Sequence, residues 1–304
     1  MTDPIPEHTH YPTLTLSHSD VSCKDVSIVG LDVKVYGLEE IKHNSLPIAA
    51  VIALHGRTNN QKQMAFFSYG LLGQEKALSK GKNRRRDMIV ITLDLPNHGE
   101  RTVDKNVNLA FDRNPRHLYD MAACVTGGCR DVSQVIDYIA AYLFPNGERV
   151  IDEYIATGVS MGGNVTWRLL REEPRINIAI PILGLPFESF ARYVGARAIK
   201  LGFPFTPPTY PPSLRPLFES PVPHDAYVGK KILSLHGERD QLVPYHYGEA
   251  DIETVLSRAA IKGEMEVWKQ EGAGHVVTVE MVKRTAEWIW RWALSADVSM
   301  HASP

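Results

Sequence analysis

Cysteine is scarce in this 304-residue chain, which contains only Cys23, Cys124 and Cys129. So few cysteines do not make the disulfide framework of a small secreted domain. No cluster of histidines or further cysteines lies near Cys124 and Cys129 to complete a zinc site. We therefore expect a reducing compartment, the cytoplasm, in which Cys124 and Cys129 are buried structural thiols.

Long apolar runs and a strong net charge are also missing. No apolar stretch approaches the roughly 20 residues that a membrane-spanning helix needs. The formal net charge of -2 gives no reason to expect nucleic acid or a membrane as a partner. The first residues lack a basic segment followed by an apolar one, so we expect no secretory signal. The one basic run, residues 82–86, is interpreted as a solvated loop that enters a buried strand.

The composition, 44% hydrophobic and 22% charged residues, is typical of a globular protein with a substantial core. Residues 1–20 are polar and lack a persistent period, which predicts a loose N-terminal arm, and residues 21–304 are expected to form one domain. Two short alternating runs, residues 22–29 and 32–38, flank a turn at Gly30. This pattern predicts an antiparallel hairpin at the start of the domain.

The pattern then changes to nearly continuous apolar runs, which are typical of strands buried on both faces of a parallel sheet. These runs occupy residues 47–54, 88–95, 154–157, 176–183 and 231–235, and residues 264–269 are expected to form the last strand. Helix-length segments separate the runs, most clearly residues 131–144 and 280–294, in which apolar residues recur at helical spacing. The alternation predicts right-handed crossovers and a doubly wound, mostly parallel α/β sheet.

One long segment interrupts this alternation. Residues 185–224 exceed the usual connection length in a compact domain and are rich in proline and aromatic residues. The segment could be a structural excursion that packs on the domain. Because it follows the carboxyl end of a strand, where open α/β sheets bind ligands, we favour a lid or cap that lines a substrate pocket.

The most informative motif is Gly158-Val159-Ser160-Met161-Gly162. A short apolar run precedes it and a helical pattern, residues 164–171, follows, so the sequence predicts a strand, a tight turn and a helix with Ser160 at the apex. The backbone of such a turn is strained, and side chains at the two glycine positions would collide with the crossing strand and helix. Ser160 is therefore a candidate nucleophile, which needs a base within hydrogen-bonding distance.

His275, in the loop Glu271-Gly272-Ala273-Gly274-His275, is the best candidate for that base, because nothing apolar and periodic surrounds it. The orienting acid is expected to be Asp240, directly after an apolar strand, with Glu238 as the alternative. Asp240 could instead cap the helix that begins near residue 245. The other histidines are weaker candidates for the base, including the three that are nearer the expected site: His98, His224 and His236.

The order Ser160, Asp240, His275 resembles that of the α/β-hydrolase superfamily, from about residue 20 to the end of the chain. The segment Leu54-His55-Gly56-Arg57 is similar to its oxyanion-hole segment. Residues 94–101, Asp-Leu-Pro-Asn-His-Gly-Glu-Arg, resemble a loop of its esterase, dienelactone-hydrolase and prolyl-oligopeptidase-like branch. The resemblance implies the α/β-hydrolase fold and an oxyanion hole formed by the backbone N–H groups of Arg57 and Met161. It gives residues 94–101 no catalytic role.

These features predict a serine hydrolase that cleaves a carboxylic ester of a small molecule, without cofactor or metal. A thioesterase, an acyl-peptide hydrolase or an acyltransferase would use the same residues, and a non-catalytic binding protein on this scaffold is less favoured. The Arg57 side chain could bind a substrate carboxylate or point to solvent. His55 and His98 could converge, but the sequence shows no metal-ligand spacing around them. The oligomeric state is left open.

Overall fold

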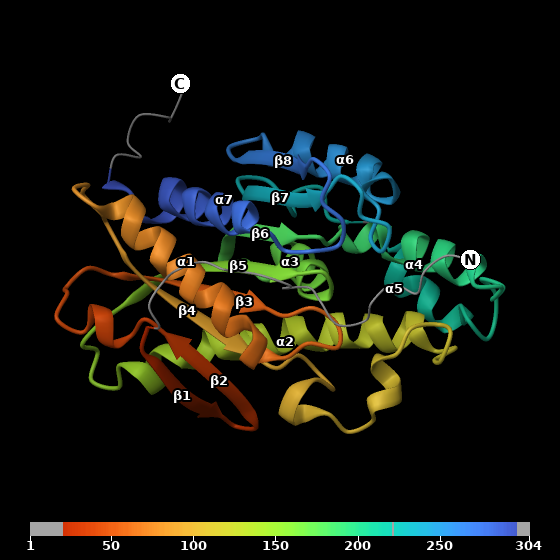
Figure 1. Ribbon diagram of the computed structural model, residues 1–304, viewed down its shortest axis with the longest axis horizontal. Coiled ribbons are helices and arrows are strands. Elements are labelled where there is room, and N and C mark those ends of the chain that lie inside the picture. Colours follow the sequence, from red (N-terminus) through yellow and green to blue (C-terminus); the bar gives the residue numbers. More distant parts are fainter. Residues whose placement is uncertain (1–20, 221, 297–304) are drawn as a thin grey trace.

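An eight-stranded sheet forms the centre of the computed structural model, which describes residues 21–220 and 222–296 (Figure 1). The predicted N-terminal arm, residues 1–20, lies outside the described residues. The strand order is β1-β2-β4-β3-β5-β6-β7-β8. The strands are β1 (Cys23–Ile28), β2 (Leu31–Tyr36), β3 (Ile48–Leu54), β4 (Asp87–Leu93), β5 (Ile151–Val159), β6 (Ile176–Ile182), β7 (Lys231–Gly237) and β8 (Glu264–Gln270).

The sheet begins with the predicted antiparallel hairpin. Strands β1 and β2 pair through a tight turn in which Val29 and Gly30 have φ angles of 41° and 83°. Strand β2 then pairs antiparallel with β4, and all the remaining neighbours are parallel. The hairpin and the six later strands confirm the mostly parallel sheet that the apolar runs predicted.

Helices cover both faces of the sheet, as the doubly wound prediction required. One face packs against α2 (His117–Leu143), α3 (Met161–Glu172) and α6 (Glu249–Ala259), and the other against α1 (Met64–Ser79) and α7 (Val279–Ile289). All seven residues of β3 are buried, because apolar side chains alternate between two cores. Burial on both faces explains why the central strands read as continuous apolar runs.

Helix α2 begins at His117, well before the predicted start at residue 131. Its first half includes Gly127 and Gly128. Glycine has a low helix propensity and adds no apolar side chain, so the helical spacing of apolar residues is hard to recognise in this part of the sequence. Added Cβ atoms would lie 2.9 Å from Pro96 Cγ and 2.8 Å from Leu95 Cδ2. The two glycines therefore let the helix pack closely against the loop that follows β4.

The basic run at residues 82–86 does lead into a buried strand, but its arginines are not simply solvated. Arg85 donates hydrogen bonds to the carbonyls of Ala293 and Trp292, and Arg86 donates to Ala293 and to Asp152. A π-helical turn, Trp290–Leu294, follows α7 and carries those carbonyls. The arginines thus satisfy acceptors at a helix end that lack partners within the helix.

The described part of the long segment at residues 185–224 contains the α-helices α4 (Phe190–Lys200) and α5 (Arg215–Glu219), which lie together at one end of the molecule (Figure 1). Phe187, Phe190 and Phe218 stack on one another, with ring centroids 5.2–5.8 Å apart. In this structure the segment is packed on the domain. Its role as a lid or cap stays a prediction.

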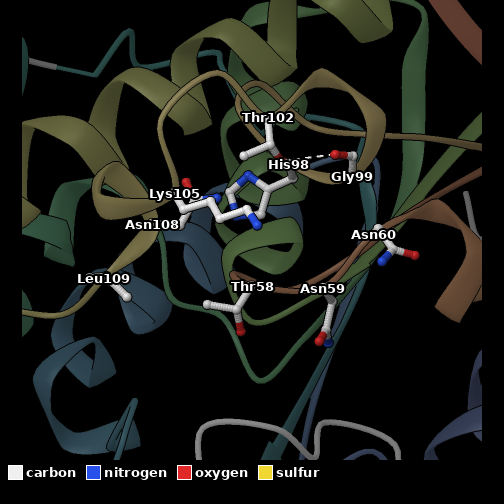
Figure 2. A pocket seen from close by; sticks show the side chains of 9 residues that line it. All are labelled: Thr58, Asn59, Asn60, His98, Gly99, Thr102, Lys105, Asn108 and Leu109. Atoms are coloured by element: carbon white, nitrogen blue, oxygen red, sulfur yellow. Dashed lines mark hydrogen bonds between the residues drawn. The ribbon is translucent and has the colours of Figure 1, made fainter.

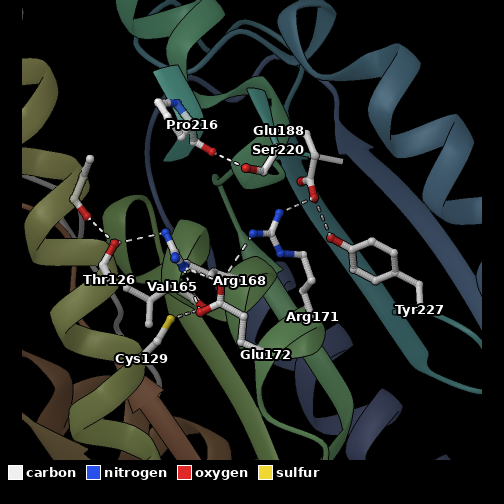
Figure 3. Close-up of polar contacts among 11 residues, drawn as sticks. Thr126, Cys129, Val165, Arg168, Arg171, Glu172, Glu188, Pro216, Ser220 and Tyr227 are labelled. Atoms are coloured by element: carbon white, nitrogen blue, oxygen red, sulfur yellow. Dashed lines mark hydrogen bonds and ion pairs between the residues drawn. The ribbon is translucent and has the colours of Figure 1, made fainter. Parts of the chain in front are cut away.

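Polar contacts join the start of this segment to helix α3, which follows Ser160 (Figure 3). Glu188 accepts hydrogen bonds from Arg171 at 3.1 Å and from the hydroxyl of Tyr227 at 3.2 Å. The Arg168 guanidinium lies 4.3 Å from the centre of the Phe187 ring. These partly buried charges are paired, which lowers the free-energy cost of removing them from water.

Cys124 and Cys129 are buried free thiols, as expected, whereas Cys23 is exposed. Their Sγ atoms donate to the carbonyls of Pro96 and Val165 at 3.4 and 3.7 Å. Burial raises the pKa of Cys124 to about 11 and that of Cys129 further. Thiols held in the protonated state are poor nucleophiles and poor metal ligands, as expected of structural thiols. No helix in the described part of the chain has the length and apolarity to span a membrane.

Candidate active site

Ser160 lies at the sharp turn between β5 and α3, as the sequence predicted. Its backbone has φ 56° and ψ −111°, a sparsely populated conformation for a residue with a side chain. A hydrogen bond from the Ser160 N–H to the carbonyl of Ile182, at the end of β6, stabilises the turn, with 2.8 Å between the nitrogen and the oxygen. Because the turn directly follows β5, the Ser160 side chain lies at the carboxyl end of the sheet, where ligands of open α/β sheets bind.

The two flanking glycines are required for this turn. A Cβ atom at Gly158 would lie 2.4 Å from the carbonyl oxygen of Gly162, and one at Gly162 would lie 2.4 Å from the carbonyl oxygen of Leu54. Both neighbouring atoms belong to the backbone and cannot move aside at low cost. The glycines therefore bring the helix that follows Ser160 into direct contact with the end of β3.

The structure brings Ser160, His275 and Asp240 together in one chain of hydrogen bonds. His275 Nδ1 lies 2.6 Å from Asp240 Oδ2, and His275 Nε2 lies 2.9 Å from Ser160 Oγ. Because an ionised carboxylate only accepts hydrogen bonds, Nδ1 carries the proton and donates it to Asp240. Nε2 is then left with a lone pair and accepts the hydrogen bond from the serine hydroxyl. A base in this tautomer can accept the serine proton during nucleophilic attack.

The carboxylate of Asp240 has a second set of partners. Its Oδ1 atom accepts hydrogen bonds from the N–H groups of Leu242 and Val243, both at 2.8 Å. Burial raises the pKa of Asp240, but the hydrogen bond and charge of His275, together with these two amides, outweigh burial and lower the pKa below its usual value. Asp240 is therefore negatively charged at neutral pH and can orient and stabilise the imidazole.

The alternatives to Asp240 and His275 lie elsewhere. Glu238 is exposed and accepts a hydrogen bond from the N–H of Gly272 at 3.0 Å. His236 is buried, its Nε2 lies 2.7 Å from Ser234 Oγ, and burial lowers its pKa to about 4. His98 is buried in the loop after β4, and His224 is exposed in the long segment. Only His275 contacts Ser160 among the histidines with described contacts.

Arg57 and Met161, the two predicted oxyanion donors, follow the ends of β3 and β5. Met161 is the first residue of α3, so its N–H belongs to the helix end whose donors have no partner within the helix. Arg57 follows β3 by three residues, and the carbonyls of Leu54 and His55 lie against Gly162. The backbone N–H groups of both residues stay predicted oxyanion donors. The Arg57 side chain is half-buried and donates to the Asn108 carbonyl at 2.5 Å, a contact that the sequence did not indicate.

Two residues near the site were missed in the sequence. Asn164 is fully buried, and its amide donates to the Tyr193 hydroxyl at 2.8 Å and accepts from the N–H of Leu185 at 3.0 Å. An asparagine one helical turn after the nucleophile in an apolar helix could have suggested a buried polar role. No local signal indicated Tyr193, because it lies in the long segment and only the fold brings it to α3.

Residues 94–101 form the loop after β4, and Asp94 helps to hold this loop in place. Asp94 accepts hydrogen bonds from the N–H groups of Gln61 at 2.7 Å and Glu100 at 3.0 Å. The rings of His55 and His98 do converge, with centroids 5.2 Å apart, but His55 Nε2 accepts the N–H of Leu95 and Nδ1 contacts the Gly56 carbonyl. Among the described residues, no group of three or more histidine, cysteine or carboxylate side chains is arranged to hold a metal ion.

Comparisons with known proteins agree with this architecture. A family model described as alpha/beta hydrolase family matches residues 51–288. The TT1662 protein of Thermus thermophilus superposes with a TM-score of 0.65 at 22% identity, covering 90% of this chain and 98% of that one. The esterase Pf2001 of Pyrococcus furiosus gives a TM-score of 0.55 at 18% identity, covering 90% of this chain and 93% of that one.

A longer enzyme shares the same fold. The acylaminoacyl peptidase of Pyrococcus horikoshii gives a TM-score of 0.58 at 14% identity, covering 91% of this chain and 42% of that one. At such identities the likeness shows a shared fold. No curated protein sequence matches the chain.

Proposed function

The chain belongs to the alpha/beta hydrolase family, and on that premise we propose that it is a serine hydrolase that cleaves carboxylic esters of small molecules. The observation that carries the proposal is the continuous series of contacts from Asp240 through His275 to Ser160, with distances of 2.6 and 2.9 Å. A hydrogen-bonded acid, base and nucleophile in this order is the arrangement that acyl transfer requires.

The proposed reaction has two halves. Ser160 Oγ attacks the ester carbonyl carbon while its proton passes to His275 Nε2, and the negative charge of Asp240 stabilises the resulting imidazolium. His275 then donates that proton to the alcohol oxygen as the C–O bond breaks, which leaves an acyl group on Ser160. Water attacks the acyl group, gives its proton to His275, and the carboxylic acid departs as Ser160 regains its proton.

The tetrahedral intermediates of both halves carry a negative oxygen. In the proposed mechanism this oxygen accepts hydrogen bonds from the backbone N–H groups of Arg57 and Met161. The amino end of α3 adds a favourable electrostatic contribution, since the dipole of a helix is positive there. One such donor typically contributes about 10²–10³ in rate.

The same groups would serve a thioesterase, an acyl-peptide hydrolase or an acyltransferase, which differ in the leaving group or in the acceptor. We favour an ester because the Pf2001 protein of Pyrococcus furiosus, which shares the fold, is named an esterase. The preference is tested by comparing an ester, a thioester and an anilide of the same acyl group.

Labelling with a fluorophosphonate probe tests the nucleophile. We expect covalent modification at Ser160, located by mass mapping, and loss of both labelling and p-nitrophenyl ester hydrolysis in Ser160→Ala. Removal of the serine from a comparable triad costs about 10⁶ in kcat. Ser257→Ala is the matched control, because Ser257 is exposed in α6, and it should keep both properties. Undiminished hydrolysis by Ser160→Ala would contradict the proposal.

A further inference from the structure

Arg197, in helix α4, is a half-buried cation without an anionic partner. In the described part of the chain, no carboxylate forms an ion pair with its guanidinium. Other half-buried arginines are paired, Arg149 with Asp87 at 2.6 Å and Arg171 with Glu188 at 3.1 Å. Removing a charge from water is costly unless the charge is paired, so the position of Arg197 requires an explanation.

Three contacts hold the Arg197 guanidinium in place and leave part of it open. Nη2 donates to the Leu242 carbonyl, Nη1 lies 3.5 Å from His117 Nε2, and Cζ lies 5.7 Å from the centre of the Tyr193 ring. Nε forms no hydrogen bond within the described residues and is not enclosed, so it is accessible to a ligand. A guanidinium carries more N–H groups than these contacts use. Groups held in place before binding lose little conformational freedom when a ligand arrives.

His117 does not compensate the charge of Arg197. Because a carbonyl only accepts hydrogen bonds, His117 Nδ1 donates to the Leu109 carbonyl at 2.9 Å, and Nε2 presents a lone pair to Arg197. Burial and the charges of Arg57 and Arg197 hold the pKa of His117 well below its usual value. The imidazole is therefore neutral at neutral pH. It accepts a hydrogen bond but supplies no negative charge.

Asp240 does not contact Arg197 either, because its oxygens have other partners. Oδ2 lies 2.6 Å from His275 Nδ1, and Oδ1 accepts from the N–H groups of Leu242 and Val243. Leu242 uses its N–H for Asp240 and its carbonyl for Arg197, so its main chain separates the two charges. Burial lowers the pKa of Arg197 more than the charge of Asp240 raises it. An anion in direct contact would therefore stabilise the guanidinium.

A second guanidinium lies along the same wall. Arg57 Nη1 donates to the carbonyl of Asn108, and the next carbonyl, that of Leu109, accepts from His117. One pocket is lined by residues from this loop and from the segment after Arg57, among them Thr58, Asn59, His98, Asn108 and Leu109 (Figure 2). The charges of both Arg57 and Arg197 act on His117. The electrostatic field around His117 therefore favours a negatively charged ligand.

The site of Arg197 borders the predicted catalytic residues. Leu242, which Arg197 contacts, is two residues after Asp240, so their Cα atoms are at most about 7 Å apart. The hydroxyl of Tyr193 accepts from the amide of Asn164, one helical turn after Ser160 in α3. Arg197 is thus held between the loop of the predicted acid and the residues packed on the nucleophile helix.

A carboxylate on an apolar molecule fits these surroundings. Its two oxygens match the planar fork of a guanidinium, and its single charge balances that of Arg197. Aromatic rings lie nearby, since Phe111 contacts His117 at 5.0 Å and the half-buried Phe203 at 5.9 Å between ring centres. We propose that Arg197 binds a carboxylate group carried by an apolar molecule, either the ester substrate or a free acid. The site itself does not depend on the proposed function, whereas its link to the substrate rests on it.

Binding is tested in Ser160→Ala, so that turnover plays no part. The probe is benzoate, followed by saturation-transfer NMR, with acetophenone as an uncharged ligand of similar shape and inorganic phosphate as a second anion. We expect saturable binding of benzoate, tighter than that of the other two. Adding Arg197→Gln removes the charge and keeps a donor for Leu242. It should weaken benzoate binding at least about tenfold, the usual effect of a hydrogen bond to a charged group, and leave acetophenone binding unchanged.

The matched control is Arg192→Met in the same background. Arg192 is exposed on the same helix and pairs with Asp251, so this variant also removes one positive charge from α4. It should leave the benzoate affinity unchanged. If Arg197→Gln fails to fold, Arg197→Lys takes its place. Lysine keeps the charge but lacks the planar fork, so benzoate should still bind more weakly than in the control.

Kinetics of the protein with Ser160 intact distinguish the two sources of the carboxylate. The esters are 4-acetoxybenzoate and 4-acetoxyacetophenone, which share the acyl group and differ in charge. If the substrate carries the carboxylate, benzoate inhibits competitively, and Arg197→Gln lowers kcat/KM about tenfold more for 4-acetoxybenzoate than for 4-acetoxyacetophenone. If a free acid binds, inhibition is noncompetitive and both esters lose equally. A displaced Asp240 would slow both esters alike, so the ratio reports binding alone.

Three results would overturn the inference: no saturable benzoate binding, tighter binding of phosphate or acetophenone, or unchanged benzoate affinity after the Arg197 substitution. None of these depends on catalysis. The proposed function fails separately, through absence of fluorophosphonate labelling at Ser160 in the wild-type protein. The two failures are therefore distinguishable.

Discussion

Arg197, in helix α4, donates a hydrogen bond to the main-chain carbonyl of Leu242, with 2.5 Å between Nη2 and the oxygen. The N–H of the same Leu242 donates to Asp240 Oδ1. Arg197 therefore links the long segment at residues 185–224 to the loop that carries the predicted catalytic acid. The other terminal nitrogen of Arg197, Nη1, lies 3.5 Å from Nε2 of His117, the first residue of α2.

We predict that Arg197 positions Asp240. Arg197→Met should lower kcat for a p-nitrophenyl ester by at least about tenfold with little change in KM, because small displacements of catalytic groups can cost about 10² in rate. Arg197→Lys, which keeps one donor, should restore part of the loss. Arg192→Met is the control, since Arg192 is exposed on the same helix and contacts Asp251. Equal kcat values for the Arg197→Met and Arg192→Met variants would refute the role.

The backbone strain at Ser160 predicts an unusual order of stability. Ser160→Gly should be more stable than Ser160→Ala by about 1 kcal/mol, because glycine accepts this conformation and strain of this kind costs about 1–3 kcal/mol. At Ser257, in helix α6, the order should reverse, since glycine is about 1 kcal/mol worse than alanine in a helix. Urea unfolding of the four variants measures both differences. The same order at both positions would show that residue 160 is not strained.

Close backbone contact at Gly162 makes a third prediction. Gly162→Ala should lower the free energy of unfolding by about 1–3 kcal/mol and reduce ester hydrolysis, because the new Cβ would displace the carbonyls of Leu54 and His55. Gly274→Ala is the matched control for stability, since no atom lies within 4 Å of an added Cβ there. Denaturant titration checks both variants. If Gly162→Ala were as stable as the control, the backbone around the turn at Ser160 would be able to move aside at no cost, which would contradict the prediction.

His236 predicts part of the pH dependence of stability. Burial lowers its pKa from 6.5 to about 4, so between these values the unfolded chain binds a proton that the folded protein does not. The free energy of unfolding should therefore fall as the pH drops from 6.5 toward 4, with up to about 3 kcal/mol from this residue. Above pH 6.5 the His236 ring is neutral in both the folded and the unfolded chain, so it no longer makes the free energy of unfolding depend on pH.

The comparison variant is His236→Gln, which removes the titrating ring. Its free energy of unfolding should depend less on pH than that of the wild type over this window. Asp240 does not confound the test, because its pKa is lowered from 3.8 and its stabilising effect is lost only in more acidic solution. Identical slopes for the two proteins, measured by urea unfolding at several pH values, would reject the assignment to His236.

The strands and the three contacting residues were predictable from local sequence. Continuous apolar runs identified the central strands because burial on both faces demands apolar residues at consecutive positions. Ser160 could be placed at a turn because its two glycine neighbours are needed wherever backbones cross so closely. His275 and Asp240 followed from their positions after strands, since the carboxyl ends of parallel strands meet at one edge.

Helix α2 and the basic run show where local patterns fell short. The first half of α2 has glycines that a propensity scale disfavours, and it is helical because those glycines let it pack on Leu95 and Pro96. Arg85 could be read only as a charged loop residue, because the carbonyls it binds lie more than 200 residues later in the chain.

By itself, the sequence determined the central strands, their alternation with helices, the turn at Ser160 and the identity of the residues that contact it. Only the tertiary structure decided that Arg197 reaches the loop of Asp240, that Asn164 joins Tyr193, and that His98 and Asn59 share a pocket. Periodicity and turn chemistry are local and can be recognised in a few consecutive residues. Partners distant in sequence are set by how the crossovers bring loops together, and no local pattern records that arrangement.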